Sequence, residues 1–158
     1  MGIDTFIGVD PGGSGAIVFI ETRIDDVWFV KCKETEGDLH GALTLSHEPS
    51  FAMIEKVSSM PGQGVSSTFK FGQSYGFLRG LLIAHEIPFE TVTPGKWQKE
   101  FGLIRKDKNE SGTDKKNRHK ARAQELFPSV KVTHANADAL LIAEYCRRVK
   151  SQQTESKG

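Results

Sequence analysis

The sequence lacks the features that mark disulfide-rich, metal-cluster or membrane-spanning proteins. It contains only two cysteines, Cys32 and Cys146, which are far apart and have no metal-binding spacing. We therefore expect them to be reduced, in a cytosol-like compartment. No hydrophobic run approaches the roughly 20 residues that span a bilayer. The opening MGIDTFIGVD also has no basic region of the kind that begins a signal peptide. These absences predict a cytoplasmic protein without a membrane segment.

The chain also has almost no net charge, since 21 Lys and Arg face 20 Asp and Glu, a formal charge of +1. The overall balance therefore indicates no particular partner. One segment departs from this balance: Pro94–Arg122 contains ten basic and four acidic residues, a net charge of +6. Such a local excess is typical of a surface that binds phosphate backbones. A solvated helix face gives the same pattern, so composition alone leaves both interpretations open.

The length and the hydrophobic pattern predict one α/β domain over residues 1–150. Three successive apolar runs joined by short turns predict an antiparallel meander, and two later strands enter through helices. The polar residues Ser151–Gly158 are expected to form a disordered tail. The expected strands are Thr5–Val9, Ala16–Glu21, Val27–Cys32, Ser50–Val57 and Ile87–Val92. The expected helices are Thr68–Ala84, Pro94–Phe101, Lys115–Phe127 and Ala137–Arg148, with Glu36–Leu45 either a short helix or a loop.

Three acidic residues lie in apolar sequence, where an unpaired charge is costly. Asp10 ends the first strand, Glu55 lies near the end of the fourth, and Asp138 falls in the first turn of the last helix. Taken singly, each has an ordinary explanation, such as a helix-end charge, a strand-end surface charge or an ion pair. Taken together, they form an oxygen cluster if the first and fourth strands are neighbours. Such a cluster suits Mg²⁺ or Mn²⁺, and two ions about 4 Å apart catalyse phosphodiester hydrolysis.

Two histidines lie near these residues in the sequence. His134 precedes Asp138 by four residues and is a candidate metal ligand or general acid–base group; the alternative is a surface histidine in a polar loop. His119 lies within the basic segment, and we interpret it as part of that charged face.

Six motifs in order carry a resemblance to a known family: GVDPGGSGA, MIEKV, KFGQSYGFLRGLL, VTPGKWQ, HKARAQELFP and NADALLIAEYCRR. Over Ile3–Arg148 the chain resembles the RuvC-type Holliday junction resolvases, most closely the short phage-encoded and plant organellar branch. The resemblance implies a ribonuclease-H-like fold, a homodimer and a Mg²⁺-dependent endonuclease that cuts two opposing strands of a four-way DNA junction. It also implies two metal ions per site, with Mn²⁺ able to substitute.

The resemblance also implies roles for individual residues. Asp10, Glu55 and Asp138 match the metal-binding carboxylates of the family. The family's fourth acidic position has no carboxylate here; His134 is our choice for it, and Asn136 is the alternative. The resemblance further predicts DNA contacts in the segment after Glu55 and in the basic helix. The residues expected to bind DNA are Lys56, Met60, Gln63, Lys70, Lys115, Lys116, Arg118 and Lys120.

Three other classes of protein share some of these features. Actin-like and sugar-kinase ATPases also begin with a strand, an aspartate and a glycine turn, but they need two such domains, and 158 residues are too few. A related nuclease acting on RNA–DNA hybrids, branched DNA or structured RNA would have the same carboxylates. A non-catalytic DNA-binding module would have the fold without needing them.

Overall fold

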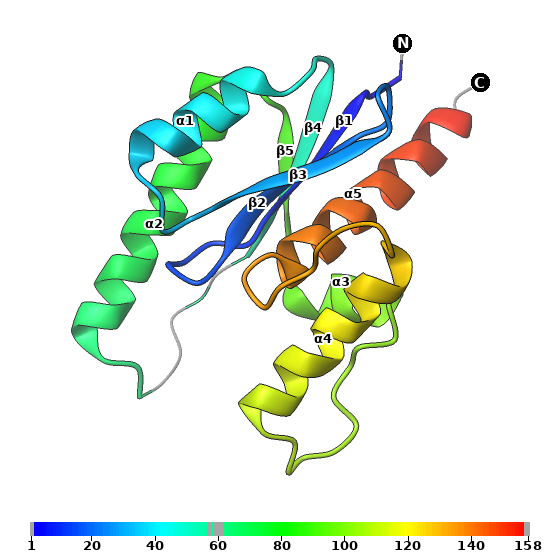
Figure 1. Ribbon diagram of the computed structural model, residues 1–158. Coiled ribbons are helices and arrows are strands. Elements are labelled where there is room, and N and C mark those ends of the chain that lie inside the picture. Colours follow the sequence, from blue (N-terminus) through cyan, green and yellow to red (C-terminus); the bar gives the residue numbers. More distant parts are fainter. Residues whose placement is uncertain (1, 57, 59–61, 157–158) are drawn as a thin grey trace.

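The computed structural model describes residues 2–56, 58 and 62–156 (Figure 1). Five strands and five helices occur within these residues. The strands are β1 (Thr5–Val9), β2 (Ala16–Glu21), β3 (Asp26–Lys31), β4 (Ser50–Glu55) and β5 (Phe89–Val92). The helices are α1 (Glu36–Leu45), α2 (Val65–Ala84), α3 (Pro94–Glu100), α4 (Gly112–Leu126) and α5 (Ala137–Glu155).

The strands form one mixed sheet in the order β3-β2-β1-β4-β5. β1, β2 and β3 are antiparallel neighbours, whereas β1 pairs in parallel with β4, and β4 with β5. The predicted α/β architecture, three antiparallel strands followed by parallel ones, is confirmed. Val9 pairs with Ile54 in the central parallel pair. The next residues, Asp10 and Glu55, therefore lie side by side at this end of the two strands.

Helices cover both faces of the sheet, with α1 and α2 on one side and α3, α4 and α5 on the other (Figure 1). On the first face Ile7 of β1 packs in a core cluster with Leu82 of α2. On the second, Phe6 belongs to a cluster with Leu140 of α5 and Trp97 of α3. β1 is thus buried on both faces, which explains why its sequence TFIGV contains no charged residue and only one polar residue, Thr5.

The contact between β1 and α5 depends on Gly8. A Cβ at Gly8 would lie 2.1 Å from the carbonyl oxygen of Ala139 and 2.3 Å from the backbone nitrogen of Ala143. The helix backbone therefore lies directly on the strand backbone, with no room for a side chain between them. This packing fixes the first turn of α5, including Asp138, close to the end of β1.

α5 differs from the prediction at its carboxyl end. It continues to Glu155, whereas the sequence predicts a helix that ends at Arg148 and a disordered tail from Ser151. Lys150 explains much of the difference, because its ammonium pairs with Glu90 of β5 at 2.5 Å and lies 4.3 Å from the ring centroid of Phe51. These contacts anchor the last turns to the sheet edge. Residues 157 and 158 lie outside the described residues.

α2 carries Gly72, Gly76 and Gly80 along one side. The sequence suggests that this glycine face packs flat on a neighbouring backbone. Among the described residues, a Cβ at any of the three would have nothing within 4 Å, so this face is open within the described part of the chain. The described part of the chain has no helix of sufficient length and hydrophobicity to cross a bilayer.

Candidate active site

Asp10 directly follows β1 and begins a glycine-rich turn, in which the backbone conformation and close contacts require glycine. The amide of Asp10 donates to the carbonyl of Ala16, and Gly15 donates to Gly12, which closes the turn at 3.0 Å. Gly12 has φ +107°, a conformation that side chains disfavour. A Cβ on Gly15 would lie 1.9 Å from the carbonyl oxygen of Asp10. The turn therefore holds the Asp10 backbone rigidly beside the end of the sheet.

Three carboxylates from three elements meet at this place: Asp10 after β1, Glu55 at the end of β4 and Asp138 in the first turn of α5. The pKa of Asp10 is raised well above its usual value, first by burial and then by repulsion from Asp138 and Glu55. Burial and Asp138 also raise the pKa of Glu55, against the lowering effects of a Trp97 hydrogen bond, Lys115 and His119. The structure therefore brings the three predicted carboxylates, the acidic cluster, close enough to repel one another, and Asp10 is the most strongly affected.

Two buried aromatic side chains hold two of these carboxylates. The indole Nε1 of Trp97 in α3 donates to Glu55 Oε2 at 2.6 Å. The Nδ1 of His119 in α4 lies 2.8 Å from Asp138 Oδ1. His119 is 2% exposed, so its assignment to the charged face is wrong. The sequence could have indicated this burial, because His119, Ala123 and Leu126 share one helix face at spacings of four and three residues.

Asp10 and Asp138 line a cavity of about 520 Å³ beside the glycine turn. Lys31 and Lys33, at and just after the end of β3, and Lys116 of α4 lie on its wall, together with the Phe71 ring and His134. Lys31 and Lys33 are absent from the sequence-based prediction. The strand register could have found Lys31, because it pairs with Ala16, directly after the glycine turn.

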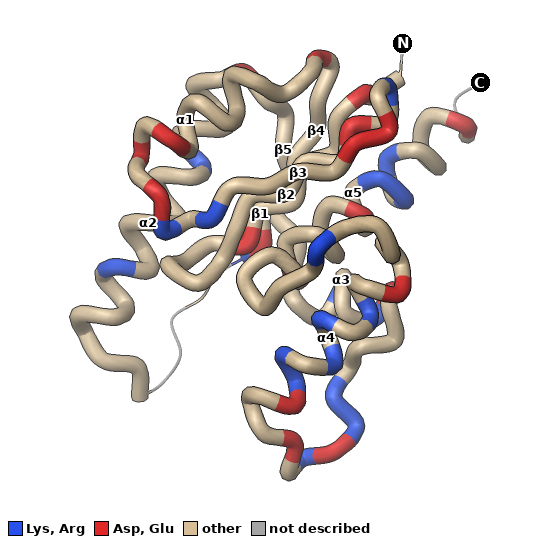
Figure 2. The backbone as a smooth tube through the Cα atoms, in the orientation of Figure 1, with Lys and Arg blue, Asp and Glu red and all other residues tan. Residues whose placement is uncertain are grey.

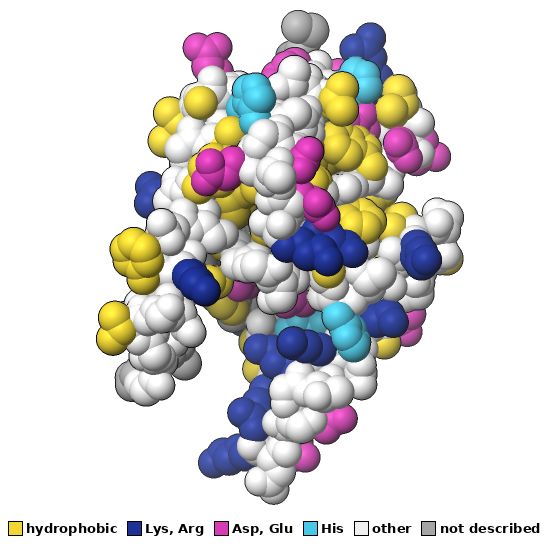
Figure 3. Space-filling model, turned by 60° about the vertical axis from the view of Figure 1, so that its left-hand side comes forward, with side chains coloured by type: hydrophobic (Ala, Val, Ile, Leu, Met, Phe, Trp, Pro, Cys, Tyr) yellow, Lys and Arg dark blue, Asp and Glu magenta, His cyan; other side chains and the backbone are white. Residues whose placement is uncertain are grey.

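The basic segment lies mainly on α3, on α4 and on the connection between them, below the sheet in the view of Figure 2. Figure 3 shows Lys and Arg side chains gathered on the surface of this basic segment, beside a hollow that separates it from α2. Lys115 and Lys116 are exposed and Lys120 is half-buried. Arg118 instead donates to both carboxylate oxygens of Glu110 and to the carbonyl of Leu103. Its guanidinium therefore braces the loop that precedes α4.

The other predicted DNA-binding residues lie on the α2 side or just after β4. Lys56, Gln63 and Lys70 are exposed. Met60 lies outside the described residues, so the structure gives no position for it.

The side chains of His134 and Asn136 differ in their exposure and in their hydrogen-bond partners. The exposed His134 donates from Nε2 to Asn117 Oδ1 of α4 at 2.9 Å, and it lines the cavity. Asn136 is buried; its amide oxygen accepts from the Thr133 backbone, and its amide nitrogen donates to the Lys131 carbonyl. Asn136 is thus occupied in the turn before α5, and of these two residues it is His134 that faces the cavity.

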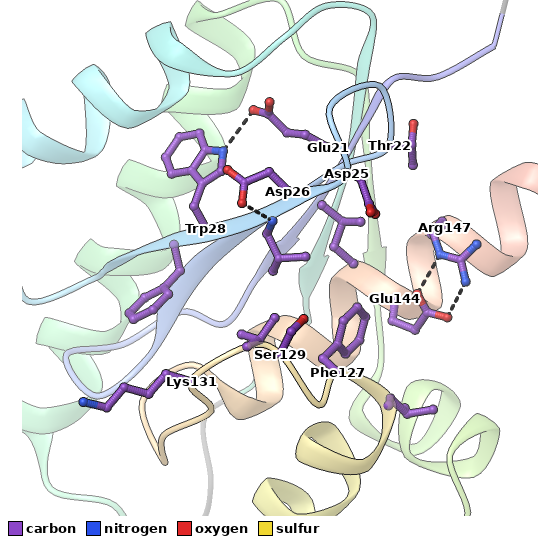
Figure 4. A pocket seen from close by; sticks show the side chains of 15 residues that line it. Glu21, Thr22, Asp25, Asp26, Trp28, Phe127, Ser129, Lys131, Glu144 and Arg147 are labelled. Carbon is purple, nitrogen blue, oxygen red and sulfur yellow. Dashed lines mark hydrogen bonds and ion pairs between the residues drawn. The ribbon is translucent and has the colours of Figure 1, made fainter.

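A larger cavity, about 760 Å³, lies elsewhere, between β3 and the connection from α4 to α5 (Figure 4). Its two buried carboxylates are paired. Glu21 accepts from Trp28 Nε1 at 3.0 Å and contacts His47, while Arg147 and Arg148 bond to Glu144. These carboxylates have structural partners, whereas the Asp10 carboxylate has none among the described residues.

Comparison with known proteins identifies the fold. No protein-family model matches the chain, and no curated protein sequence matches it either. Among solved structures, RuvC of Thermus thermophilus in complex with a Holliday junction substrate matches with a TM-score of 0.55 and 16% identity, over 92% of this chain and 96% of that one. A second Thermus thermophilus RuvC structure matches with a TM-score of 0.54 and 16% identity, over 92% and 97%. The chain has the fold of RuvC. The expected ribonuclease-H-like fold is therefore confirmed over nearly the whole chain.

Within this RuvC fold, the acidic cluster suits a divalent cation in the kind of its donors. Carboxylate oxygens are the ligands that Mg²⁺ and Mn²⁺ prefer, and a cation would offset the repulsion that raises the pKa of Asp10. Among the described residues, no three His, Cys, Asp or Glu side chains are already grouped to hold one ion. Glu55 bonds to Trp97 and Asp138 to His119 instead. The residues fit the ion in the chemistry of their donor atoms.

Proposed function

We propose that this chain is a divalent-metal-dependent endonuclease that resolves four-way (Holliday) DNA junctions. The observation that carries the proposal is the convergence of Asp10, Glu55 and Asp138 beside a cavity with lysines on its wall. Repelling carboxylates next to cationic side chains suit a site that holds metal ions and a phosphodiester together. The RuvC likeness supports the substrate class, because one of the matching structures contains a Holliday junction substrate.

Asp10, Glu55 and Asp138 would hold two Mg²⁺ ions, or Mn²⁺ in their place, with His134 as a further ligand or proton carrier. When bound, such ions supply an activated water and stabilise the leaving oxygen in phosphodiester hydrolysis. The protein positions the carboxylates through the rigid glycine turn and the β1–α5 packing. Cleavage is expected to leave 5′-phosphate and 3′-hydroxyl ends.

Basic side chains on the cavity wall and on the neighbouring helices would bind the DNA backbone. We assign phosphate contacts to Lys115, Lys116 and Lys120 on α4 and to Lys70 on α2, and we add Lys31 and Lys33 at the cavity wall. Lys56, Met60 and Gln63, in the segment after β4, would reach toward the junction centre. Arg118 would act indirectly, by holding the loop before α4 through Glu110.

A homodimer would match the symmetry of this substrate, because two opposing strands must be cut in related geometry. The open glycine face of α2, with Phe69 66% and Ile83 63% exposed, supports α2 as the surface between two copies. We therefore propose that two copies of the chain bind one junction.

The proposed activity is tested with synthetic DNA of defined branching. The protein is incubated with four-way, Y-shaped and linear duplex DNA, and with an RNA–DNA hybrid, in Mg²⁺, Mn²⁺ or chelator. We expect paired, symmetric cuts in the four-way junction, and none with chelator. Equal cutting of linear duplex would contradict junction selectivity, and preferential cutting of the hybrid would favour the related hybrid nuclease.

The salt dependence of binding tests the basic surface. Each phosphate contact contributes about 0.9 to the slope of log affinity against log salt. Replacing Lys115 and Lys116 together by alanine should therefore flatten the slope by about 2, measured by fluorescence anisotropy with a labelled junction in chelator. Replacing Lys31 and Lys33 should do the same. The control pair, Arg23→Ala with Lys131→Ala, lies outside the cavity that Asp10 and Asp138 line. Unchanged slopes in both test pairs would mean that neither surface faces the DNA.

A further inference from the structure

Two carboxylates of the acidic cluster, Glu55 and Asp138, are connected through the side chains of Trp97 and His119. The connection begins at Glu55, passes to Trp97 through a 2.6 Å hydrogen bond, and ends at Asp138, which His119 contacts at 2.8 Å. The rings of Trp97 and His119 meet edge to face, with centroids 5.4 Å apart and planes at 77°. We propose that Trp97 and His119 are a positioning pair, which sets the separation of Glu55 and Asp138 and thereby the affinity of the site for its divalent ions.

In both hydrogen bonds the ring is the donor and the carboxylate is the acceptor, as a positioning role requires. A carboxylate only accepts, so both rings donate: Trp97 through Nε1–H and His119 through Nδ1–H. Each carboxylate keeps its second oxygen, Oε1 of Glu55 and Oδ2 of Asp138, without a hydrogen bond from the pair. The rings orient the carboxylates without occupying both of their oxygens, as side chains behind metal ligands do.

Burial makes the two rings a rigid spacer. Trp97 is fully buried in the core and His119 is 2% exposed, so neither ring can swing away without opening the core. Glu55 and Asp138 come from β4 and α5, two elements that repulsion between their carboxylates would push apart. The packed rings come from α3 and α4, and they connect the two carboxylates through contacts independent of the sheet.

Packing alone does not account for His119. Its Nε2 is buried and has no hydrogen-bond partner among the described residues. A leucine would fill such a core position without leaving a nitrogen unsatisfied. The imidazole is therefore better explained by the bond from Nδ1 to Asp138 than by stability.

The sequence contains a matched control for Trp97. Trp28 also donates its Nε1 to a buried carboxylate, Glu21, at 3.0 Å, as Figure 4 shows. That pair lines the larger cavity, and among the described residues it forms no hydrogen bond with the acidic cluster. Trp97→Phe and Trp28→Phe each remove one indole–carboxylate hydrogen bond, but only the first removes it from a proposed metal ligand.

The test measures Mn²⁺ binding directly, by calorimetry and by the electron paramagnetic resonance of free Mn²⁺, without DNA. This inference rests on the proposed function, because it assumes that the cluster binds divalent ions. We expect Trp97→Phe and His119→Leu each to weaken Mn²⁺ binding about tenfold or more, the range typical for residues behind metal ligands. Trp28→Phe should leave the affinity within about twofold of the wild type. His119→Asn, whose amide can donate in place of Nδ1, should recover much of the loss.

The outcomes separate the two hypotheses. Wild-type affinity in Trp97→Phe and His119→Leu would overturn the positioning role while leaving the metal site intact. Equal weakening by Trp28→Phe would also overturn it, because the effect would then follow general destabilisation. No Mn²⁺ binding by the wild type would overturn the proposed metal site and the positioning role with it. Thermal unfolding of each variant checks the fold, and if Trp97→Phe does not fold, the two His119 variants decide.

Discussion

Asp10→Asn is expected to abolish junction cleavage and, in the absence of metal, to make the protein more stable. The loss is expected because Asp10 is a proposed metal ligand close to Glu55 and Asp138, and an amide lacks the negative charge that attracts the ion. A metal ion contributes several kcal/mol to transition-state stabilisation, and each 1.36 kcal/mol is a factor of ten in rate. We therefore expect the cleavage rate to fall by about 1,000-fold or more, measured on a four-way junction with Mg²⁺ in excess.

The gain in stability has the same physical cause. Burial and two neighbouring carboxylates raise the pKa of Asp10 above its value in the unfolded chain. A raised carboxyl pKa favours the folded state below the unfolded pKa, about 3.9, and this contribution is lost as the pH rises through the folded pKa. The metal-free wild type should therefore lose stability toward neutral pH, and Asp10→Asn should not. A gain of about 1 kcal/mol would raise Tm by about 3 °C.

Glu21→Gln provides the control for Asp10→Asn. Glu21 is also a buried carboxylate, but Trp28 and His47 bond to it. Removing its charge should lower Tm and leave cleavage unchanged, the reverse of the Asp10 result on both measurements. Added Mn²⁺ should raise the Tm of the wild type and of Glu21→Gln, but not that of Asp10→Asn. Retained cleavage in Asp10→Asn would contradict a catalytic role for this cluster.

The residues of the acidic cluster were predictable because each lies at a recognisable place in a local pattern. β1 has no charged residue because both of its faces are covered, and a charged residue directly after such a run is conspicuous. From the sequence, Asp10 and Glu55 are neighbours only on the condition that the first and fourth strands pair, and β1 does pair with β4. The catalytic and metal-binding roles of these residues remain a prediction.

For the residues around the cluster, the sequence could indicate burial, as for His119, but not the contact partner, because that depends on contacts between distant elements. His119 follows three basic residues in a helix start, and only the packing of α4 against α5 turns it toward Asp138, 19 residues later. Arg118, its neighbour, resembles a DNA ligand in the sequence but bonds to Glu110. Lys33 reaches the cavity from just beyond β3, far in sequence from the basic segment. The number of charged residues in a segment does not show which of them are buried, which form ion pairs and which face the cavity.

Gly8→Ala is expected to be among the most destabilising single substitutions in the chain. The added Cβ would lie 2.1 Å from the Ala139 carbonyl oxygen, 2.3 Å from the Ala143 nitrogen and 2.9 Å from the Ala143 Cα. All three are backbone atoms, so the contact can be relieved only by moving the whole of α5 away from β1. Overpacking of a core typically costs about 1–3 kcal/mol, and we expect the upper end, a fall in Tm of about 6–12 °C.

The same substitution should also reduce cleavage, because α5 carries Asp138 one residue before the contact at Ala139. Gly41→Ala is the matched control: it lies within α1, where a Cβ would meet nothing within 4 Å. That change should stabilise the protein by about 0.5–1 kcal/mol, because alanine loses less backbone conformational freedom than glycine when the helix forms. Thermal unfolding and Mn²⁺ binding of both variants check the expectation. A Gly8→Ala protein with wild-type Tm would show that α5 does not rest on β1 as described, and the assigned place of Asp138 beside Asp10 would then be wrong as well.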